Sequence, residues 1–200
     1  GSDAHPLEWA FQRGSELGFD GLEMCMPASA RPFGMAGQWS DETIEGVRAL
    51  SDRYHMSIYS LSSDWAWAYS AFFPKLSEWA KGVELIADDA KLAHKLGAHT
   101  MLIHCATSKG SWEDCRAVMK DVAAAGEASG VRLGYEANIW ERLGFGGLDS
   151  LCRMVDEVGS HYFGVYLHNA YPRAGLPLHE EIERSGARLV KAMHSSSLVS

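Results

Sequence analysis

The feature that most constrains the fold is a repeated pattern, in which a helical segment ends at a glycine or polar turn and a short strand follows. The strands are apolar on both faces, which is typical of parallel sheets covered by helices. They begin near residues 20, 56, 99, 131, 163 and 189, and their spacing of roughly 26 to 43 residues is that of a βα unit. The helical segments span about residues 6–17, 40–50, 76–96, 111–128, 147–157 and 177–186. Six βα units in succession leave two architectures, a doubly wound open sheet and a (β/α)8 barrel.

The ends of these helical segments carry residues that are typical of helix caps. Ser40 precedes the second segment and Ser111 precedes the fourth, where Asp114 adds the spacing of a capping box. Glycines that suit the left-handed conformation after a helix stand at positions 18, 97, 130, 159 and 186.

The (β/α)8 TIM-barrel type is the fold class that we expect. No G-x-G-x-x-G motif follows the first strand, which argues against a dinucleotide-binding open sheet. Residues 1–200 contain no linker or low-complexity run, so we expect a single barrel domain. The pattern opens on a helix, and its sixth strand lies close to Ser200. We therefore expect the first and last strands of the barrel to be missing from this sequence.

Composition excludes several classes of partner. The net charge is -8, and no cluster of lysine and arginine stands out, so a nucleic-acid partner is not expected. No apolar stretch approaches the length of a membrane-spanning helix, and no signal peptide is visible. Four cysteines without C-x-x-C spacing fit a reducing compartment, so we expect a cytoplasmic protein. A homo-oligomer is compatible with the sequence.

Polar residues recur where the strands end, and in a barrel the carboxyl ends of the strands carry the functional residues. Five of the six strands end in a glutamate or a histidine, namely Glu23, His104, Glu136, His168 and His194. Carboxylate and imidazole groups suit a divalent metal ion. A metal can hold two adjacent oxygens of a sugar and stabilise an enediolate, while a carboxylate takes the proton next to the carbonyl.

A single residue of this kind is more often a hydrogen-bonding or substrate-contact group, which is how we interpret Glu23. His104 is interpreted as a substrate contact or a ligand of a second ion. Glu136, His168 and His194 occupy consecutive strands and are the predicted metal ligands. Other predicted substrate contacts are Trp65 and Trp67 in an aromatic loop, Asn138, Glu141 and Arg142 in a loop that we expect after Glu136, and Asn169 after His168. For the aromatic loop, simple packing against the barrel is the alternative.

Four short segments resemble the xylose-isomerase-like TIM-barrel superfamily: GLEM (21–24), LIHC (102–105), GYEAN (134–138) and KAMHSS (191–196). The superfamily includes sugar and sugar-phosphate isomerases and epimerases, inosose dehydratases and endonuclease IV-type DNA repair enzymes. The resemblance extends over roughly residues 6–196. It implies a barrel fold, a divalent metal cofactor (Mn, Co, Zn or Mg) and a sugar or sugar-derivative substrate.

Within the superfamily, the ketose 3-epimerases hold their metal with a Glu, an Asp, a His and a final Glu. The resemblance assigns the first Glu to Glu136 and the His to His194, and the final Glu would lie beyond Ser200. His168 stands where the Asp is usual, and Tyr171 stands where a His is usual. An imidazole at 168 preserves a ligand but removes one negative charge, which favours softer ions over Mg. The alternatives are that His168 contacts substrate or that the metal site has decayed.

The sequence therefore predicts a metal-dependent isomerase or epimerase of a sugar, sugar phosphate or polyol, with Glu136 as ligand and base. Three alternatives remain open. They are a related lyase or dehydratase acting on a keto-sugar, an endonuclease IV-like DNA repair enzyme, and a non-catalytic sugar-binding subunit with a degenerate metal site.

Overall fold

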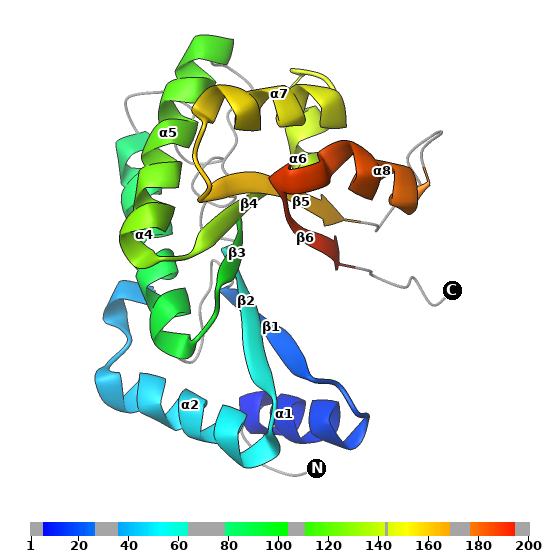
Figure 1. Cartoon of the computed structure of the whole chain (residues 1–200). Coiled ribbons are helices and arrows are strands. Elements are labelled where there is room, and N and C mark those ends of the chain that lie inside the picture. The colour runs from blue at the N-terminus through cyan, green and yellow to red at the C-terminus, as the bar shows by residue number, and fades with distance from the viewer. Residues whose placement is uncertain are drawn as a thin grey trace.

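Six parallel strands form one curved sheet in the computed structural model, which describes residues 6–26, 36–63, 79–103, 111–142, 144–168 and 177–194 (Figure 1). In chain order they are β1 (Gly21–Met26), β2 (Ser57–Ser63), β3 (Thr100–Ile103), β4 (Arg132–Glu136), β5 (Phe163–His168) and β6 (Leu189–His194). Their order across the sheet equals their order along the chain. A doubly wound sheet reverses its strand order partway, so the observed order confirms the barrel type of fold.

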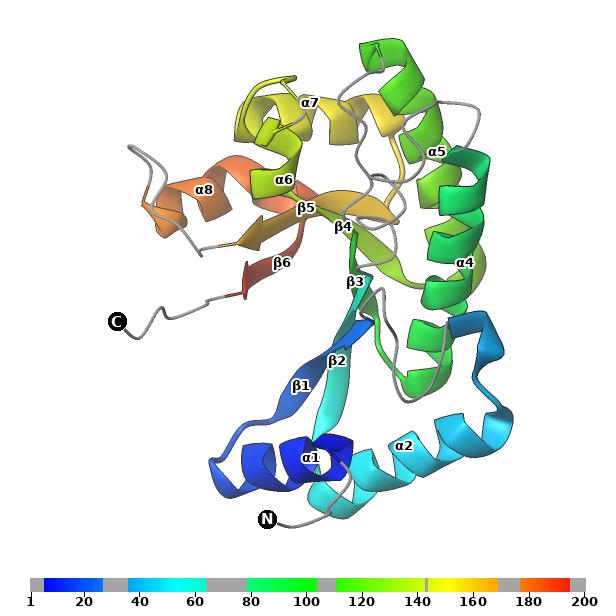
Figure 2. The same cartoon turned by 180° about the vertical axis from the view of Figure 1, so that it is seen from behind.

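Helices cover the outer, convex face of this sheet, as the two opposite views show (Figures 1 and 2). They are α1 (Pro6–Glu16), α2 (Asp41–Tyr54), α4 (Trp79–Leu96), α5 (Trp112–Ser129), α7 (Leu148–Val158) and α8 (Leu178–Ser185). Three shorter elements complete the described chain: η1 (Ala36–Gln38), α6 (Ala137–Arg142) and η3 (Gly186–Arg188). None of the helices in these described ranges is long and apolar enough to cross a membrane.

The predicted helix caps are confirmed. The Ser40 side chain accepts a hydrogen bond from the backbone N–H of Thr43 at the start of α2. At the start of α5, Ser111 and Asp114 form both hydrogen bonds of a capping box. Helix α2 ends at His55, which has a φ of 53° and is the one non-glycine residue with a positive φ in the described segments. His55 therefore has a structural role at a helix end.

The main core lies between the helices and the outer face of the sheet. Ile86 and Ala90 of α4, which the helical periodicity places on one stripe, are fully buried there, as is Met119 of α5. They belong to the same cluster as Met101 and Ile103, which alternate along β3. These side chains pack the helices against the outer face of the sheet. The inner face is not part of this contact and can carry residues with other roles.

The prediction that the strands are apolar on both faces holds for β3, where Met101, Leu102 and Ile103 are all buried. It is wrong for strands whose inner face carries polar side chains, such as Glu23 of β1. Two glycines, Gly134 and Gly164, pair in register on the inner face, and the Tyr166 side chain and Val190 occupy the space beside them. A Cβ at Gly134 would lie 2.9 Å from Cβ of Tyr166. Polar residues share the inner face, because burial on this side of a barrel is compatible with paired polar groups as well as with apolar ones.

Candidate functional site

The inner face holds a cluster of four polar side chains from four strands, centred on Glu23 of β1. One carboxylate oxygen, Oε2, accepts hydrogen bonds from Ser60 of β2, from the hydroxyl of Tyr166 at 2.9 Å, and from Nζ of Lys191 at 2.9 Å. Lys191 also donates to Oγ of Ser60 at 2.7 Å. The cluster thus connects β1 and β2 with β5 and β6, which lie at the other edge of the sheet.

The charges in this cluster are mutually stabilised. Burial by itself raises the pKa of Glu23, but the hydrogen bonds from Ser60 and Lys191 and the positive charge of Lys191 outweigh it, and the pKa lies below its usual value. Burial raises the pKa of Tyr166, and the negative charge of Glu23 raises it further. At neutral pH Glu23 is therefore an anion, and Tyr166 is a neutral hydrogen-bond donor.

Glu136, the predicted base, lies beside this cluster. It ends β4, is 7% exposed, and pairs in register with Tyr166, which in turn pairs with Lys191. Residues that pair in register in a parallel sheet point to the same face, so Glu136 lies on the inner face. Its charge is one of the causes of the raised pKa of Tyr166. The structure therefore brings Glu136 and Glu23 to the same region, from β4 and β1.

The two predicted histidine ligands are neighbours in the backbone. His168 ends β5, His194 ends β6, and the two residues are register partners. Their side chains lie outside the described part of the structure. The structure therefore places the backbones of these two predicted ligands, and their role as metal ligands stays a prediction. Among the described side chains, no group of three or more His, Cys, Asp or Glu residues could hold a metal ion.

The other predicted substrate contacts fall into two groups. His104, Trp65, Trp67 and Asn169 lie outside the described residues. Asn138, Glu141 and Arg142 belong to α6, which begins directly after Glu136. The interpretation of residues 138–142 as a loop is therefore wrong, because this segment forms a short helix at the end of β4.

Helix α6 is held by Trp140, which is fully buried. Its indole N–H donates to Oγ of Ser150 at 2.7 Å, and its ring makes an edge-on contact with Tyr135 of β4. The ring also packs against Trp112 and Phe145. These contacts fix the backbone that follows Glu136, and so they position the end of β4.

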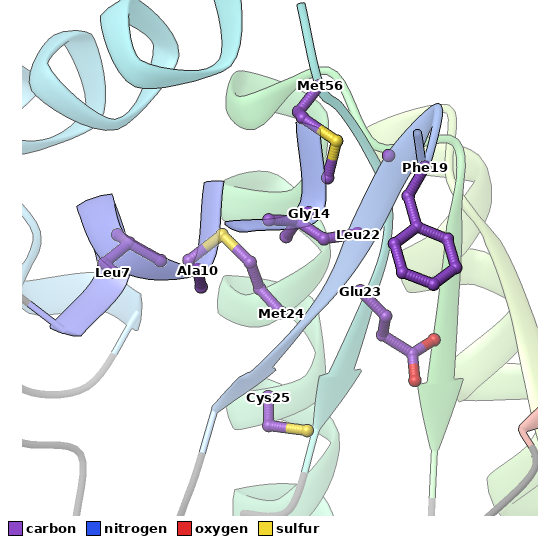
Figure 3. A pocket seen from close by; sticks show the side chains of 10 residues that line it. Leu7, Ala10, Gly14, Phe19, Leu22, Glu23, Met24, Cys25 and Met56 are labelled. Carbon is purple, nitrogen blue, oxygen red and sulfur yellow. The ribbon is translucent and has the colours of Figure 1, made fainter. Parts of the chain in front are cut away.

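A hollow of about 280 Å³ lies along the outer edge of β1 and reaches Glu23. Figure 3 shows that Glu23 and Phe19 lie on one side of β1, while Leu7 and Ala10 belong to α1 on the other side. Within the described sheet β1 pairs with β2 alone.

Lys191 and Tyr166 are the two residues of this site that the sequence interpretation missed. Each lies in the middle of an apolar strand, LVKAMH and FGVYLH, where a charged or hydroxyl-bearing residue is unusual. A lysine inside a buried strand needs a partner of opposite charge. That requirement was the available signal, but it does not say which carboxylate is the partner.

Comparisons with known proteins agree with this fold. Residues 11–196 match a family model described as "Xylose isomerase-like TIM barrel". A search of curated protein sequences finds no match. Similar solved structures include a D-psicose 3-epimerase with D-tagatose from Clostridium cellulolyticum H10, with a TM-score of 0.74 and 19% identity over 96% of this chain and 68% of that one.

Two further structures represent different activities on the same fold. A 3-keto-D-glucoside 4-epimerase from E. coli has a TM-score of 0.70 and 14% identity, over 98% of this chain and 77% of that one. An AP endonuclease of family 2 from Brucella melitensis has a TM-score of 0.65 and 16% identity, over 95% of this chain and 74% of that one. Identities this low show the fold alone, and the chain spans between two thirds and about three quarters of the length of these three proteins.

Proposed function

Because the chain belongs to the xylose isomerase-like TIM barrel family, we propose that it is a metal-dependent isomerase or epimerase acting on a sugar, a sugar phosphate or a related polyol. Its structural neighbours include epimerases of D-psicose and of a 3-keto-D-glucoside. The proposed reaction begins with removal of the proton next to a carbonyl, and isomerisation, epimerisation and elimination all share this step.

The observation that carries the proposal is the placement of Glu136, His168 and His194 at the carboxyl ends of three adjacent parallel strands. One carboxylate and two imidazoles form a donor set that fits Mn, Co or Zn better than Mg. These three residues would hold the ion. When bound, such a metal would polarise the oxygens of the substrate and stabilise negative charge on them.

The chain's own residues supply the remaining chemistry. Glu136 is buried at the end of β4, where a carboxylate can take a proton from a bound sugar. The neighbouring Tyr166 keeps its proton, since burial and the charge of Glu23 both raise its pKa. Helix α6 is held by Trp140 and Ser150 and follows Glu136 directly. Its residues Asn138, Glu141 and Arg142 are the further substrate contacts of the proposal.

A DNA repair endonuclease is the second candidate, because an AP endonuclease of family 2 is among the similar structures. The net charge of -8 argues against it, since binding to the phosphate backbone depends on lysine and arginine contacts. Binding to a duplex with an abasic site that weakens steeply with salt would favour this candidate over the first.

Solvent exchange tests the leading proposal directly. The protein is incubated in D2O with Mn2+ or Co2+ and a panel of ketoses that includes D-tagatose and D-psicose, and the sugars are examined by NMR and mass spectrometry. We expect deuterium at the carbon next to the carbonyl, and a Glu136→Gln variant should lose about 100-fold or more of this rate. Loss of water from a keto-sugar would instead indicate a dehydratase.

The exposed residue Glu127, near the end of α5, provides a matched control, because it precedes β4 and so lies at the end of that strand opposite Glu136. Glu127→Gln should retain proton exchange at a rate much closer to that of the unsubstituted protein than Glu136→Gln does. If no sugar of the panel takes up deuterium in the presence of either metal, the isomerase proposal is wrong.

A further inference from the structure

The Glu23 cluster has hydrogen-bonding capacity that its internal contacts do not use. All three donors bond to Oε2 of Glu23, and Oε1 receives no hydrogen bond from the described residues. The Lys191 ammonium has three N–H donors, and the described residues accept two of them, at Glu23 and Ser60. One acceptor oxygen and one N–H donor of the same ion pair are therefore left without a hydrogen bond from the described residues, and Nζ also lies 5.6 Å from the centroid of the Tyr166 ring.

Two carboxylates on the outer helices, Glu157 and Asp156, are bonded differently, whereas Glu8 accepts from Arg53 and Tyr54 at Oε1 alone. Glu157, on the outer helices, uses both oxygens: Trp112 and Arg116 donate to Oε2, and Arg153 donates to Oε1. Asp156 likewise uses both of its oxygens in the ion pair with Arg188. If the cluster served only to hold β1 and β6 together, a further hydrogen bond to Oε1 of Glu23 would add to its stability.

The unused groups are within reach of a small molecule. The side chains of Glu23 and Lys191 are 14% and 28% exposed. Tyr166, which donates to Glu23, pairs in register with Glu136. A molecule bound at Glu23 would thus lie on the same inner face as the predicted base.

We propose that Glu23 and Lys191 form a hydroxyl-recognition subsite for a neutral polyhydroxylated substrate. Each sugar hydroxyl can donate one hydrogen bond and accept others. One hydroxyl donates to Oε1 of Glu23, and the same or an adjacent hydroxyl accepts from Lys191. The carboxylate of Glu23 repels a phosphate or carboxylate placed there, so the subsite selects the uncharged part of the substrate. This subsite rests on the proposed function, because it assigns the substrate class to the same inner face.

Direct binding measurements test the subsite. D-tagatose is titrated into the full chain by calorimetry or NMR, in EDTA and in Mn2+, and D-tagatose 6-phosphate serves as the charged comparison. We expect Glu23→Gln and Lys191→Met each to weaken D-tagatose binding about tenfold or more, because each removes a hydrogen bond to a charged group. The double variant Glu23→Gln/Lys191→Met, in which neither charge is left unpaired, should show a loss at least as large while remaining folded.

The matched control is Glu157→Gln, which perturbs an equally well-bonded carboxylate on the outer helices and should leave binding unchanged. The subsite is refuted if the folded variants bind D-tagatose as tightly as the unsubstituted protein. It is equally refuted if the unsubstituted protein shows no saturable binding of D-tagatose, or binds the phosphate through the same two residues. If both variants turn over the sugar at the rate of the unsubstituted protein, the subsite is wrong and the isomerase proposal stands. If D-tagatose binding depends on both residues but no sugar exchanges a proton, the isomerase proposal is wrong and the subsite stands.

Discussion

Lys191 on β6 donates a hydrogen bond of 2.9 Å to Glu23 on β1, although these two strands form opposite edges of the described sheet and share no backbone ladder. The two residues are 168 positions apart in the sequence. Their ion pair is partly buried, and the hydrogen bonds from Ser60 and Tyr166 offset part of the cost of removing the carboxylate from water. The pair thus connects the two ends of the curved sheet from the inside.

We predict strong energetic coupling between these two residues. Lys191→Met should lower the free energy of unfolding by about 3 kcal/mol, because it leaves the carboxylate of Glu23 partly buried without its cation. The double variant with Glu23→Gln should be more stable than the sum of the two single losses predicts. Urea unfolding of the four proteins measures the coupling, and additive losses would show that the contact contributes nothing of its own.

The pH dependence of stability should report the ionisation of Glu23. Its pKa in the folded protein is lower than the ordinary value of 4.5, so folding favours the ionised form. The resulting stabilisation is complete above about pH 4.5 and disappears as the pH falls through the lower folded value. Unfolding measured at several pH values should show the gap between the unsubstituted protein and Glu23→Gln narrowing in acid. A gap that widens in acid would mean that burial dominates and raises the pKa.

Metal content should depend on the ends of β4, β5 and β6. Glu136→Ala, His168→Ala and His194→Ala should each lower Mn, Co or Zn retention at least tenfold, since each removes one ligand of the predicted set. Metal analysis after dialysis gives the measurement. His161→Ala is the matched control, because this exposed histidine precedes β5 at the opposite end of the strand. Equal metal content in all five proteins would disprove the assignment.

Close packing on the inner face should make Gly164 intolerant of a side chain. A Cβ there would overlap the backbone carbonyl oxygen of Arg188 and lie 2.7 Å from Cγ2 of Val190, and backbone atoms cannot move aside cheaply. Gly164→Ala should therefore destabilise the protein by about 2 kcal/mol or more. Gly46→Ala, in the interior of α2 with nothing within 4 Å, should instead stabilise it by up to about 1 kcal/mol. Thermal unfolding of both variants distinguishes these outcomes.

Much of the secondary structure could be predicted because its signals are local. Ser111 and Asp114 cap a helix within four residues of each other, and Gly130 ends the same helix in a left-handed conformation. The alternation of such helices with short strands required a parallel sheet. Helix α6 was missed because its stability comes from the contacts of Trp140 with Ser150 and Tyr135, which no pattern within six residues can indicate.

The candidate site likewise contains residues that could be predicted from local patterns and residues that could not. The sequence by itself placed Glu136, His168 and His194 at the ends of consecutive strands, because strand ends can be found from local patterns. It placed Glu23 at the end of the first strand, which is wrong because β1 continues to Met26, and it could not say that Lys191 and Tyr166 would meet Glu23. Which inner-face side chains meet depends on the stagger between strands, and register shifts between β1 and β2 and between β5 and β6 alter that stagger. Only the tertiary structure decides those contacts, because they depend on the curvature of the whole sheet.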